Sequence, residues 1–106
     1  MGREELKQKI ERGDKVTLVN MLSEFAFRSK RIPGSVNVSN LEQAKRLLNP
    51  RDEIVVYCSD PNCYASIVGY RKLTEAGFQN VRRFAGGLLE WEAAGYPLEG
   101  DDVDRS

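Results

Sequence analysis

The sequence has 106 residues, which is enough for one compact domain and too few for two. Its 16 basic and 16 acidic residues cancel, so no overall field would recruit a nucleic acid or a membrane surface, and we expect neither as a partner. The chain has no histidine, which removes the commonest general base and metal ligand, and two cysteines alone do not make a zinc site. We therefore expect no metal and no cofactor.

The first 14 residues are charged throughout and lack the apolar stretch of a secretory signal. The densest apolar run, Ile54 to Cys58, is far too short to span a bilayer. Two cysteines without a targeting segment are typical of a reducing compartment, so we expect a cytoplasmic location. Residues 1–98 are expected to form the domain, and the charged tail over 99–106 is expected to fray.

Short helices and short strands alternate in the first half of the chain, because apolar residues at helical spacing give way to apolar runs bounded by turn formers. In chain order the sequence predicts a helix over 4–12, a strand over 16–19, a helix over 23–28, a turn over 32–35, a strand over 36–38 and a helix over 41–48. Ser39 and Glu42 have the spacing of a capping box for the last of these helices.

The second half continues the alternation and contains the most apolar strand. It predicts a strand over 54–57, a polar loop over 58–63, a helix from about residue 64 to Gly77, a strand over 81–84 and a helix over 88–94. Such alternation indicates an α/β protein whose mostly parallel sheet is covered by helices on both faces. Ligands of these sheets bind beyond the carboxyl ends of the strands, and this position nominates Cys58.

Cys58 ends the most apolar strand and begins a polar loop that leads into a helix. Backbone N–H groups in such a loop can converge on one anion, and the dipole of the next helix adds to the effect. Both favour the thiolate, which is the reactive form of cysteine, and would equally stabilise a persulfide. The alternative is an inert thiol, since cysteine is among the most buried residue types.

Four segments resemble, in order and spacing, the motifs of rhodanese-like domains. Residues 31–35, R-I-P-G-S, resemble the H-I-P-G-A signature after the first helix of that family. Residues 55–58, V-V-Y-C, resemble the strand that delivers its catalytic cysteine, and residues 86–97 resemble its closing G-G-x-x-x-W-x-x-A-G-Y-P segment. Residues 16–22 resemble its first strand, although Asn20 and Leu22 replace the aspartate and arginine of the usual D-x-R.

The resemblance implies an α/β fold with a five-stranded, mostly parallel sheet flanked by helices on both faces. It also implies a sulfurtransferase: a small sulfur donor such as thiosulfate loads Cys58 as a persulfide, and a thiol acceptor or acceptor protein removes the sulfur. Arg31 would face the pocket from the loop after the first helix. The loop residues expected to bind the substrate are Ser59, Asp60, Pro61, Asn62, Cys63 and Ser66.

The loop departs from the family's C-x-x-x-x-R-S pattern, because Cys63 stands at the arginine position and the serine falls later, at Ser66. Without an arginine to clamp phosphate, a phosphatase or an arsenate reductase is disfavoured. The only charge left in the loop is Asp60, which predicts poor use of dianionic thiosulfate and better use of persulfides or polysulfide.

Three roles are open for Cys63: a resolving thiol that attacks the Cys58 persulfide and releases sulfide, a redox latch that protects Cys58, or a small residue that closes the start of the helix. The sequence therefore predicts a sulfurtransferase. The alternative is a rhodanese-like regulatory or redox-sensing binding module with weak catalysis that uses Cys58 and Cys63.

Outside the loop we expect structural roles. Trp91 is predicted to be a core or interface anchor rather than a substrate platform, and Gly86-Gly87 to supply a turn with positive φ. Arg82-Arg83 is predicted to be solvated surface charge.

Overall fold

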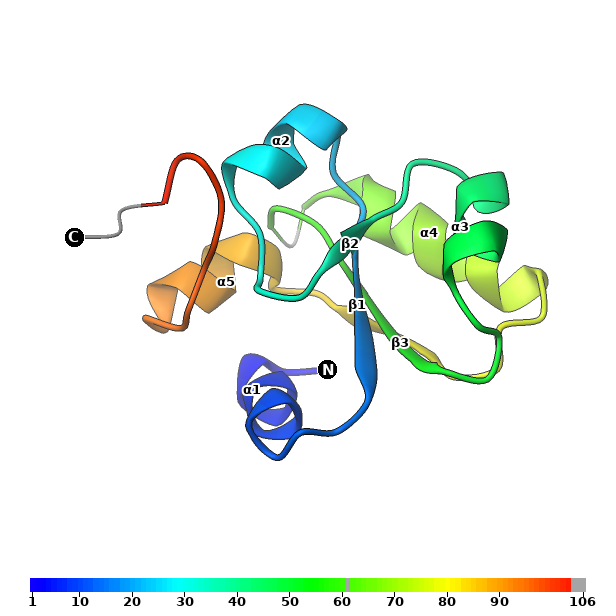
Figure 1. Ribbon diagram of the computed structural model, residues 1–106, viewed down its shortest axis with the longest axis horizontal. Coiled ribbons are helices and arrows are strands. Elements are labelled where there is room, and N and C mark those ends of the chain that lie inside the picture. The colour runs from blue at the N-terminus through cyan, green and yellow to red at the C-terminus, as the bar shows by residue number, and fades with distance from the viewer. Residues whose placement is uncertain (61, 104–106) are drawn as a thin grey trace.

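Four strands form one parallel sheet in the computed structural model, which describes residues 1–60 and 62–103 (Figure 1). The strands are β1 (Val16–Asn20), β2 (Val36–Asn37), β3 (Glu53–Tyr57) and β4 (Val81–Phe84), in the order β2-β1-β3-β4. The most apolar run, β3, is therefore a central strand. The expected fifth strand is absent from the described residues, where Arg31 and Glu99 instead form an isolated antiparallel bridge.

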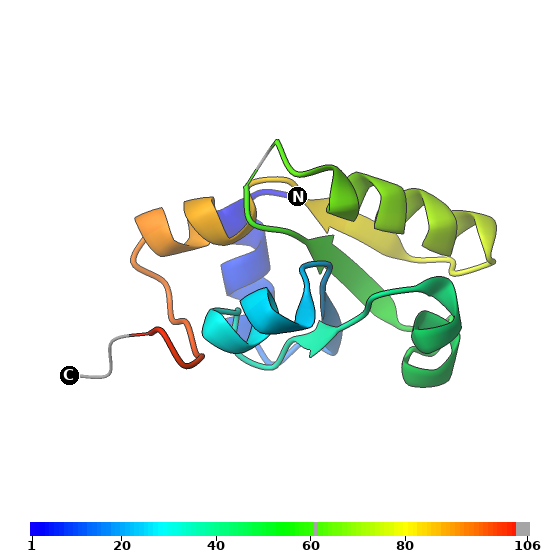
Figure 2. The ribbon, with the colours of Figure 1, turned by 90° about the horizontal axis from the view of Figure 1, so that it is seen from above.

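Helices cover both faces of the sheet, which confirms the predicted α/β architecture. They are α1 (Arg3–Glu11), α2 (Glu24–Ser29), α3 (Leu41–Leu47), α4 (Tyr64–Glu75) and α5 (Gly87–Ala93). Helices α3 and α4 lie on one face and α1 and α5 on the other, while α2 lies beyond the carboxyl end of β1 (Figures 1 and 2).

Alternation along β3 divides the core between the two faces. Ile54 and Val56 belong to the apolar cluster that includes residues of α3 and α4. Val55 and Tyr57 belong to the cluster with α1 and α5. Because both faces are covered, the strand reads as a continuous apolar run rather than an alternating one.

Trp91 is a core residue, as predicted, with 1% of its surface exposed. Its indole Nε1 donates a hydrogen bond to the carbonyl of Pro97 at 2.7 Å. The rings of Phe84 and Tyr96 meet it edge to face. The closing segment of the chain therefore packs α5 against the sheet.

The cap of α3 lies one residue later than predicted. The side chain of Asn40 accepts a hydrogen bond from the Gln43 amide at 2.8 Å, and Gln43 Oε1 accepts from the Ser39 amide at 2.7 Å. The Ser39–Glu42 capping box is therefore wrong. Asparagine is as good an N-cap as serine, so composition alone did not separate the two positions.

The segment after Leu98, where the sequence predicts a fraying tail, makes backbone hydrogen bonds to the rest of the domain through Glu99, Asp101 and Asp102. The Arg31 and Glu99 amides donate to each other's carbonyl groups at 2.9 and 3.0 Å. The Asp101 amide donates to Arg28 at 2.8 Å. Gly100 is buried at φ 137°, and a Cβ there would lie 2.4 Å from the Ser29 carbonyl oxygen. Residues 104–106 lie outside the described residues.

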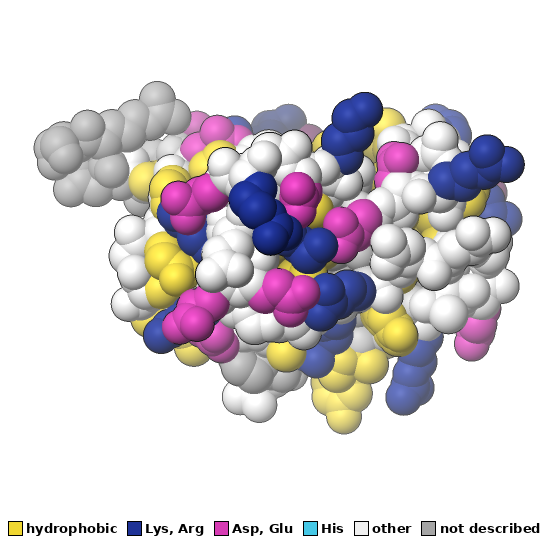
Figure 3. All heavy atoms as spheres, turned by 90° about the horizontal axis from the view of Figure 1, so that it is seen from below, with side chains coloured by type: hydrophobic (Ala, Val, Ile, Leu, Met, Phe, Trp, Pro, Cys, Tyr) yellow, Lys and Arg dark blue, Asp and Glu magenta, His cyan; other side chains and the backbone are white. Residues whose placement is uncertain are grey.

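The surface carries charges of both signs. On the face seen in Figure 3, basic and acidic side chains are interspersed, in keeping with the net charge of zero. None of the described helices has the length and apolar character needed to cross a bilayer.

Candidate active site

Cys58 follows directly after β3, at the carboxyl edge of the sheet, and 1% of its surface is exposed. Alternation from Val56 places it on the α4 side of the sheet. Its carbonyl oxygen accepts a hydrogen bond from the Leu88 amide at 3.0 Å, and the Ser59 carbonyl accepts from the Leu89 amide at 2.8 Å. The first turn of α5 thus holds the base of the loop that carries the thiol.

Gly87 makes this close approach sterically feasible. Its φ is 61°, and a Cβ at this position would lie 2.5 Å from the Cys58 carbonyl oxygen. The predicted positive φ is confirmed for Gly87. Gly86 has φ −66°, within the ordinary helical range, so Gly87 supplies the positive φ of the pair.

The hydroxyl of Tyr57 joins the strand before Cys58 to the R-I-P-G-S segment. It accepts hydrogen bonds from the Ile32 amide and from Asn20 Nδ2, both at 3.1 Å, and lies 2.7 Å from Ser35 Oγ. Tyr57 is fully buried. Burial raises the pKa of its phenol, because the charged form would lose hydration, and the hydrogen bonds oppose that shift in part.

Asn20, which stands at the aspartate position of the family's D-x-R, has a structural role in this fold. It is fully buried, donates to Tyr57, and accepts from the Leu22 amide at 2.9 Å through Oδ1. The side chain of Asn37 donates to the Leu22 carbonyl at 2.8 Å. A neutral amide suits this place because it both donates and accepts, whereas a buried carboxylate would require a cationic partner.

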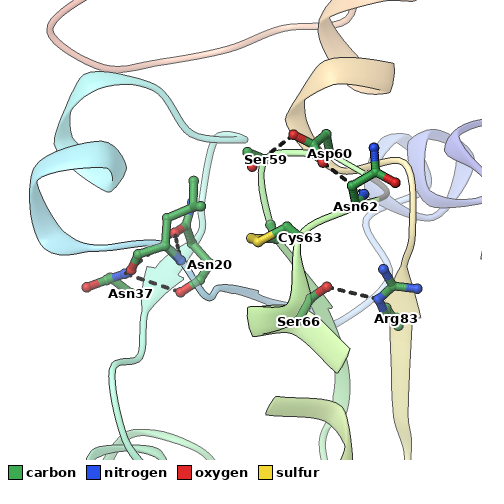
Figure 4. Close-up of a disulfide and its surroundings, with 10 residues drawn as sticks. Asn20, Asn37, Ser59, Asp60, Asn62, Cys63, Ser66 and Arg83 are labelled. Carbon is green, nitrogen blue, oxygen red and sulfur yellow. Dashed lines mark hydrogen bonds between the residues drawn. A yellow bond between two sulfur atoms is a disulfide. The ribbon is translucent and has the colours of Figure 1, made fainter. Parts of the chain in front are cut away.

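Asp60 organises the Cys58 loop. Its Oδ1 accepts a hydrogen bond from the Asn62 amide at 2.8 Å, and its carbonyl accepts from the Cys63 amide at 3.2 Å, while Ser59 Oγ donates to Oδ2 at 3.5 Å (Figure 4). Aspartate favours such turns because its side chain can bond to the backbone two residues later. Two amides of the predicted sulfur cradle are therefore directed at Asp60. Pro61, another predicted binding residue, lies outside the described residues.

Cys58 and Cys63 form a disulfide, with their Cα atoms 6.2 Å apart. Cys63 is half-buried at the N-cap of α4. This pairing favours the two roles in which Cys63 acts as a thiol over a purely packing role. In the described part of the chain, no group of three or more histidine, cysteine or acidic side chains could hold a metal ion.

The structure does not bring Arg31 to the loop. Arg31 Nε donates to Glu99 Oε1 at 3.1 Å, and Nη1 donates to the Phe27 carbonyl at 3.3 Å. Its guanidinium also lies 5.0 Å from the centre of the Phe27 ring. These contacts attach the end of the domain to the segment after α2.

Arg83 lies beside the loop, although the sequence suggested plain surface charge. Its Nε donates to Ser66 Oγ at 2.9 Å, and Ser66, a predicted binding residue, is 1% exposed in the first turn of α4 (Figure 4). Arg82 lies on the opposite face and pairs with Glu5 of α1. Adjacent residues of a strand point to opposite faces of the sheet, and helices were expected on both faces. The pair Arg82-Arg83 in a predicted strand therefore already indicated that the two side chains face different helices.

A cavity of about 320 Å³ opens between α3 and α4. One of its lining residues is Tyr64, which directly follows Cys63 in the chain. Gly69 makes room for the Met21 side chain, because a Cβ there would lie 2.4 Å from Met21 Cε. Such a concave, mostly apolar space can take the apolar part of a small molecule. The cavity is lined by Met21, Val38, Ser39, Asn40, Leu41, Ala44, Tyr64, Ala65, Val68, Gly69, Lys72 and Leu73.

Comparison with known protein families identifies the family of this domain. The family model described as Rhodanese-like domain matches residues 2–94. The chain belongs to the rhodanese-like domain family. This confirms the resemblance seen in the sequence.

Relatives of this rhodanese-like domain include both a regulator and an enzyme. The chain is 35% identical over 99 residues to an HTH-type transcriptional regulator of Mycobacterium tuberculosis, covering 92% of this chain and 43% of the regulator. It is 34% identical over 70 residues to Thiosulfate sulfurtransferase 18 of Arabidopsis thaliana, covering 66% of this chain and 50% of that protein. The chain therefore spans about half the length of these curated relatives or less.

Solved structures share the fold. A Rhodanese-like domain from Anabaena sp. superposes with a TM-score of 0.88 at 25% identity, covering 100% of this chain and 82% of that one. A Thiosulfate sulfurtransferase from Pseudomonas aeruginosa matches with a TM-score of 0.80 at 24% identity, covering 94% of this chain and 20% of that one. In this rhodanese-like domain, the R-I-P-G-S segment serves the fold through Tyr57 and Glu99.

Proposed function

We propose that this domain is a sulfurtransferase that carries sulfane sulfur as a persulfide on Cys58. The observation that carries the proposal is the position of Cys58: it follows the central strand of a parallel sheet and begins the loop into α4, in a rhodanese-like domain. The named activity of the Arabidopsis relative supports the same reaction class. The partners would be a small sulfur donor and a thiol acceptor or acceptor protein.

The reaction is a pair of displacements at sulfur. The Cys58 thiolate attacks the outer sulfur of thiosulfate, a new S–S bond forms, and sulfite leaves with the electron pair of the broken bond. An acceptor thiolate then attacks the outer sulfur of the Cys58 persulfide, takes that sulfur and returns Cys58 as a thiolate. Neither step changes the redox balance of the protein, so no external oxidant is needed.

The Cys58–Cys63 disulfide must be reduced before sulfur can be loaded, because both cysteines are engaged in it. Cys63 is the more exposed partner. A reducing thiol would therefore attack the Cys63 sulfur and release Cys58 as a thiolate, and a second thiol would resolve the mixed disulfide. A reducing compartment such as the cytoplasm would keep the pair open.

The disulfide supports a second candidate function, in which the domain is a redox-sensing or sulfide-releasing module. The Cys63 thiolate would attack the inner sulfur of the Cys58 persulfide, forming the observed disulfide and releasing hydrosulfide. Two electrons from an acceptor dithiol would then restore the thiols. The match to a transcriptional regulator suggests a regulatory setting for such chemistry.

Intact mass spectrometry separates the two functions. The reduced protein is freed of reductant and mixed with thiosulfate or polysulfide. A stable gain of one sulfur supports the carrier, and loss of two hydrogens with release of hydrosulfide supports the redox module. Cys58→Ser should gain no sulfur, whereas Cys63→Ser should keep it. Loading of Cys58→Ser at the parent rate would refute the assignment of Cys58.

A further inference from the structure

The loop around Cys58 contains no cation of its own. Between Cys58 and Ser66 its only charged residue is Asp60. Arg31, expected to supply the charge, is engaged by Glu99 and Phe27. A sulfur donor that arrives as an anion would therefore need a positive group from another part of the fold.

Sheet register places Arg83 on the same side as Cys58. Arg83 is the partner of Val56 across β3 and β4, and partners in a parallel pair point to the same face. Val56 packs in the cluster with α3 and α4, and Cys58 follows it by two residues. The side chain of Arg83 therefore lies on the side of the sheet from which Cys58 leaves the end of β3.

Ser66 orients the guanidinium toward the loop. The 2.9 Å hydrogen bond from Arg83 Nε to Ser66 Oγ attaches it to the first turn of α4, three residues after Cys63. Ser66 is buried and Arg83 is half-buried, so this contact is partly shielded from bulk water. Figure 4 shows Arg83 projecting from its strand toward Ser66, beside the loop that carries Cys63.

We propose that Arg83 positions the anionic end of the sulfur donor at Cys58, so that the neighbouring strand supplies the charge that the loop lacks. The ligand class is a small sulfur compound with an oxyanion group, such as thiosulfate. The inference rests on the proposed sulfurtransferase function. A guanidinium binds oxyanions through directed N–H donors, and its charge also stabilises the sulfite that leaves.

Charge-selective alkylation tests this inference independently of sulfur transfer. Iodoacetate and iodoacetamide react with a thiolate by the same displacement, but only iodoacetate is an anion. Their rates are compared in a Cys63→Ser background, which leaves Cys58 as the single thiol and keeps a good N-cap for α4. Arg83→Gln should lower the ratio of iodoacetate to iodoacetamide rates by about three- to tenfold.

Arg82→Gln is the matched control, because Arg82 lies next in sequence but faces α1 and pairs with Glu5. Arg82→Gln should leave the ratio of iodoacetate to iodoacetamide rates unchanged. Arg83→Lys should give a ratio between those of the parent and Arg83→Gln, because the charge is kept. A merely structural role for Arg83 would change both alkylation rates together. An unchanged ratio in Arg83→Gln, or an equal fall in both rates, would overturn the proposal.

Thiosulfate loading gives the second measurement. Arg83→Gln should lower kcat/KM for persulfide formation from thiosulfate by about ten- to a hundredfold, the effect typical of losing a hydrogen bond to a charged group. Arg82→Gln should match the parent. If the parent protein gains no sulfur at all, the proposed function fails, while the alkylation ratio still decides whether Arg83 attracts anions to Cys58.

Discussion

Substitution of Tyr57 by phenylalanine should destabilise the domain substantially, although it removes a single oxygen atom. The hydroxyl accepts from the Ile32 amide and Asn20 Nδ2, each 3.1 Å away, and both residues are fully buried. A buried donor left without its acceptor costs about 1–3 kcal/mol. Two such donors give an expected loss of about 2–6 kcal/mol, while Ser35 Oγ keeps its own hydrogen bond to the Ile32 carbonyl.

For a chain of 106 residues, the entropy of unfolding is about 0.2 kcal/mol per degree, so this loss corresponds to a fall in Tm of roughly 10–30 °C. Urea unfolding of the reduced protein measures the loss in free energy of unfolding, with the fluorescence of the buried Trp91, the single tryptophan, as the reporter. Tyr64→Phe is the control, because Tyr64 is 77% exposed.

The refuting result is a loss below about 1 kcal/mol for Tyr57→Phe, or a loss no larger than that of Tyr64→Phe. A double-mutant cycle with Ser35→Ala adds a check. Because the Ser35 and Tyr57 oxygens are 2.7 Å apart, the two substitutions should not be additive.

Three further changes follow from the same contacts. Gly87→Ala should lower the free energy of unfolding by at least about 2 kcal/mol, because φ is 61° and the added Cβ would meet the Cys58 carbonyl. Gly13→Ala, at φ 78° in open space, should lower it by only about 1 kcal/mol in the same urea titration, and equal losses would refute the steric argument. Asp60→Asn keeps an acceptor for the Asn62 amide but removes the loop's negative charge, so thiosulfate loading should rise by up to about tenfold; a rate equal to the parent's would show that Asp60 does not repel the donor. Burial raises the pKa of Tyr57 in the folded state, so the stability that the neutral phenol contributes is complete below the unfolded pKa of about 10 and is lost as pH rises through the higher folded value. The free energies of unfolding of the parent and of Tyr57→Phe should therefore converge at high pH.

Local pattern was enough to predict the framework of this protein. Strand β3 is apolar at every buried position, so its central place follows from the burial of both its faces. The Cys58 loop was also predictable from the local sequence, because a strand, turn formers and a helix succeed one another within a few residues. The nearness of Cys58 and Cys63 is likewise a local property, because the two residues are five apart in sequence.

Polar partnerships were decided by tertiary structure alone. Arg31 meets Glu99 across 68 residues, and Tyr57 meets Asn20 across 37. Sequence alternation sends Arg82 and Arg83 to opposite faces of β4, but it does not say that α1 covers one face and α4 the other. The roles of Glu5 and Ser66 as their partners follow only from that packing. Burial is encoded residue by residue in local periodicity, whereas a charged or hydroxyl group takes its partner from whichever distant segment the topology brings beside it.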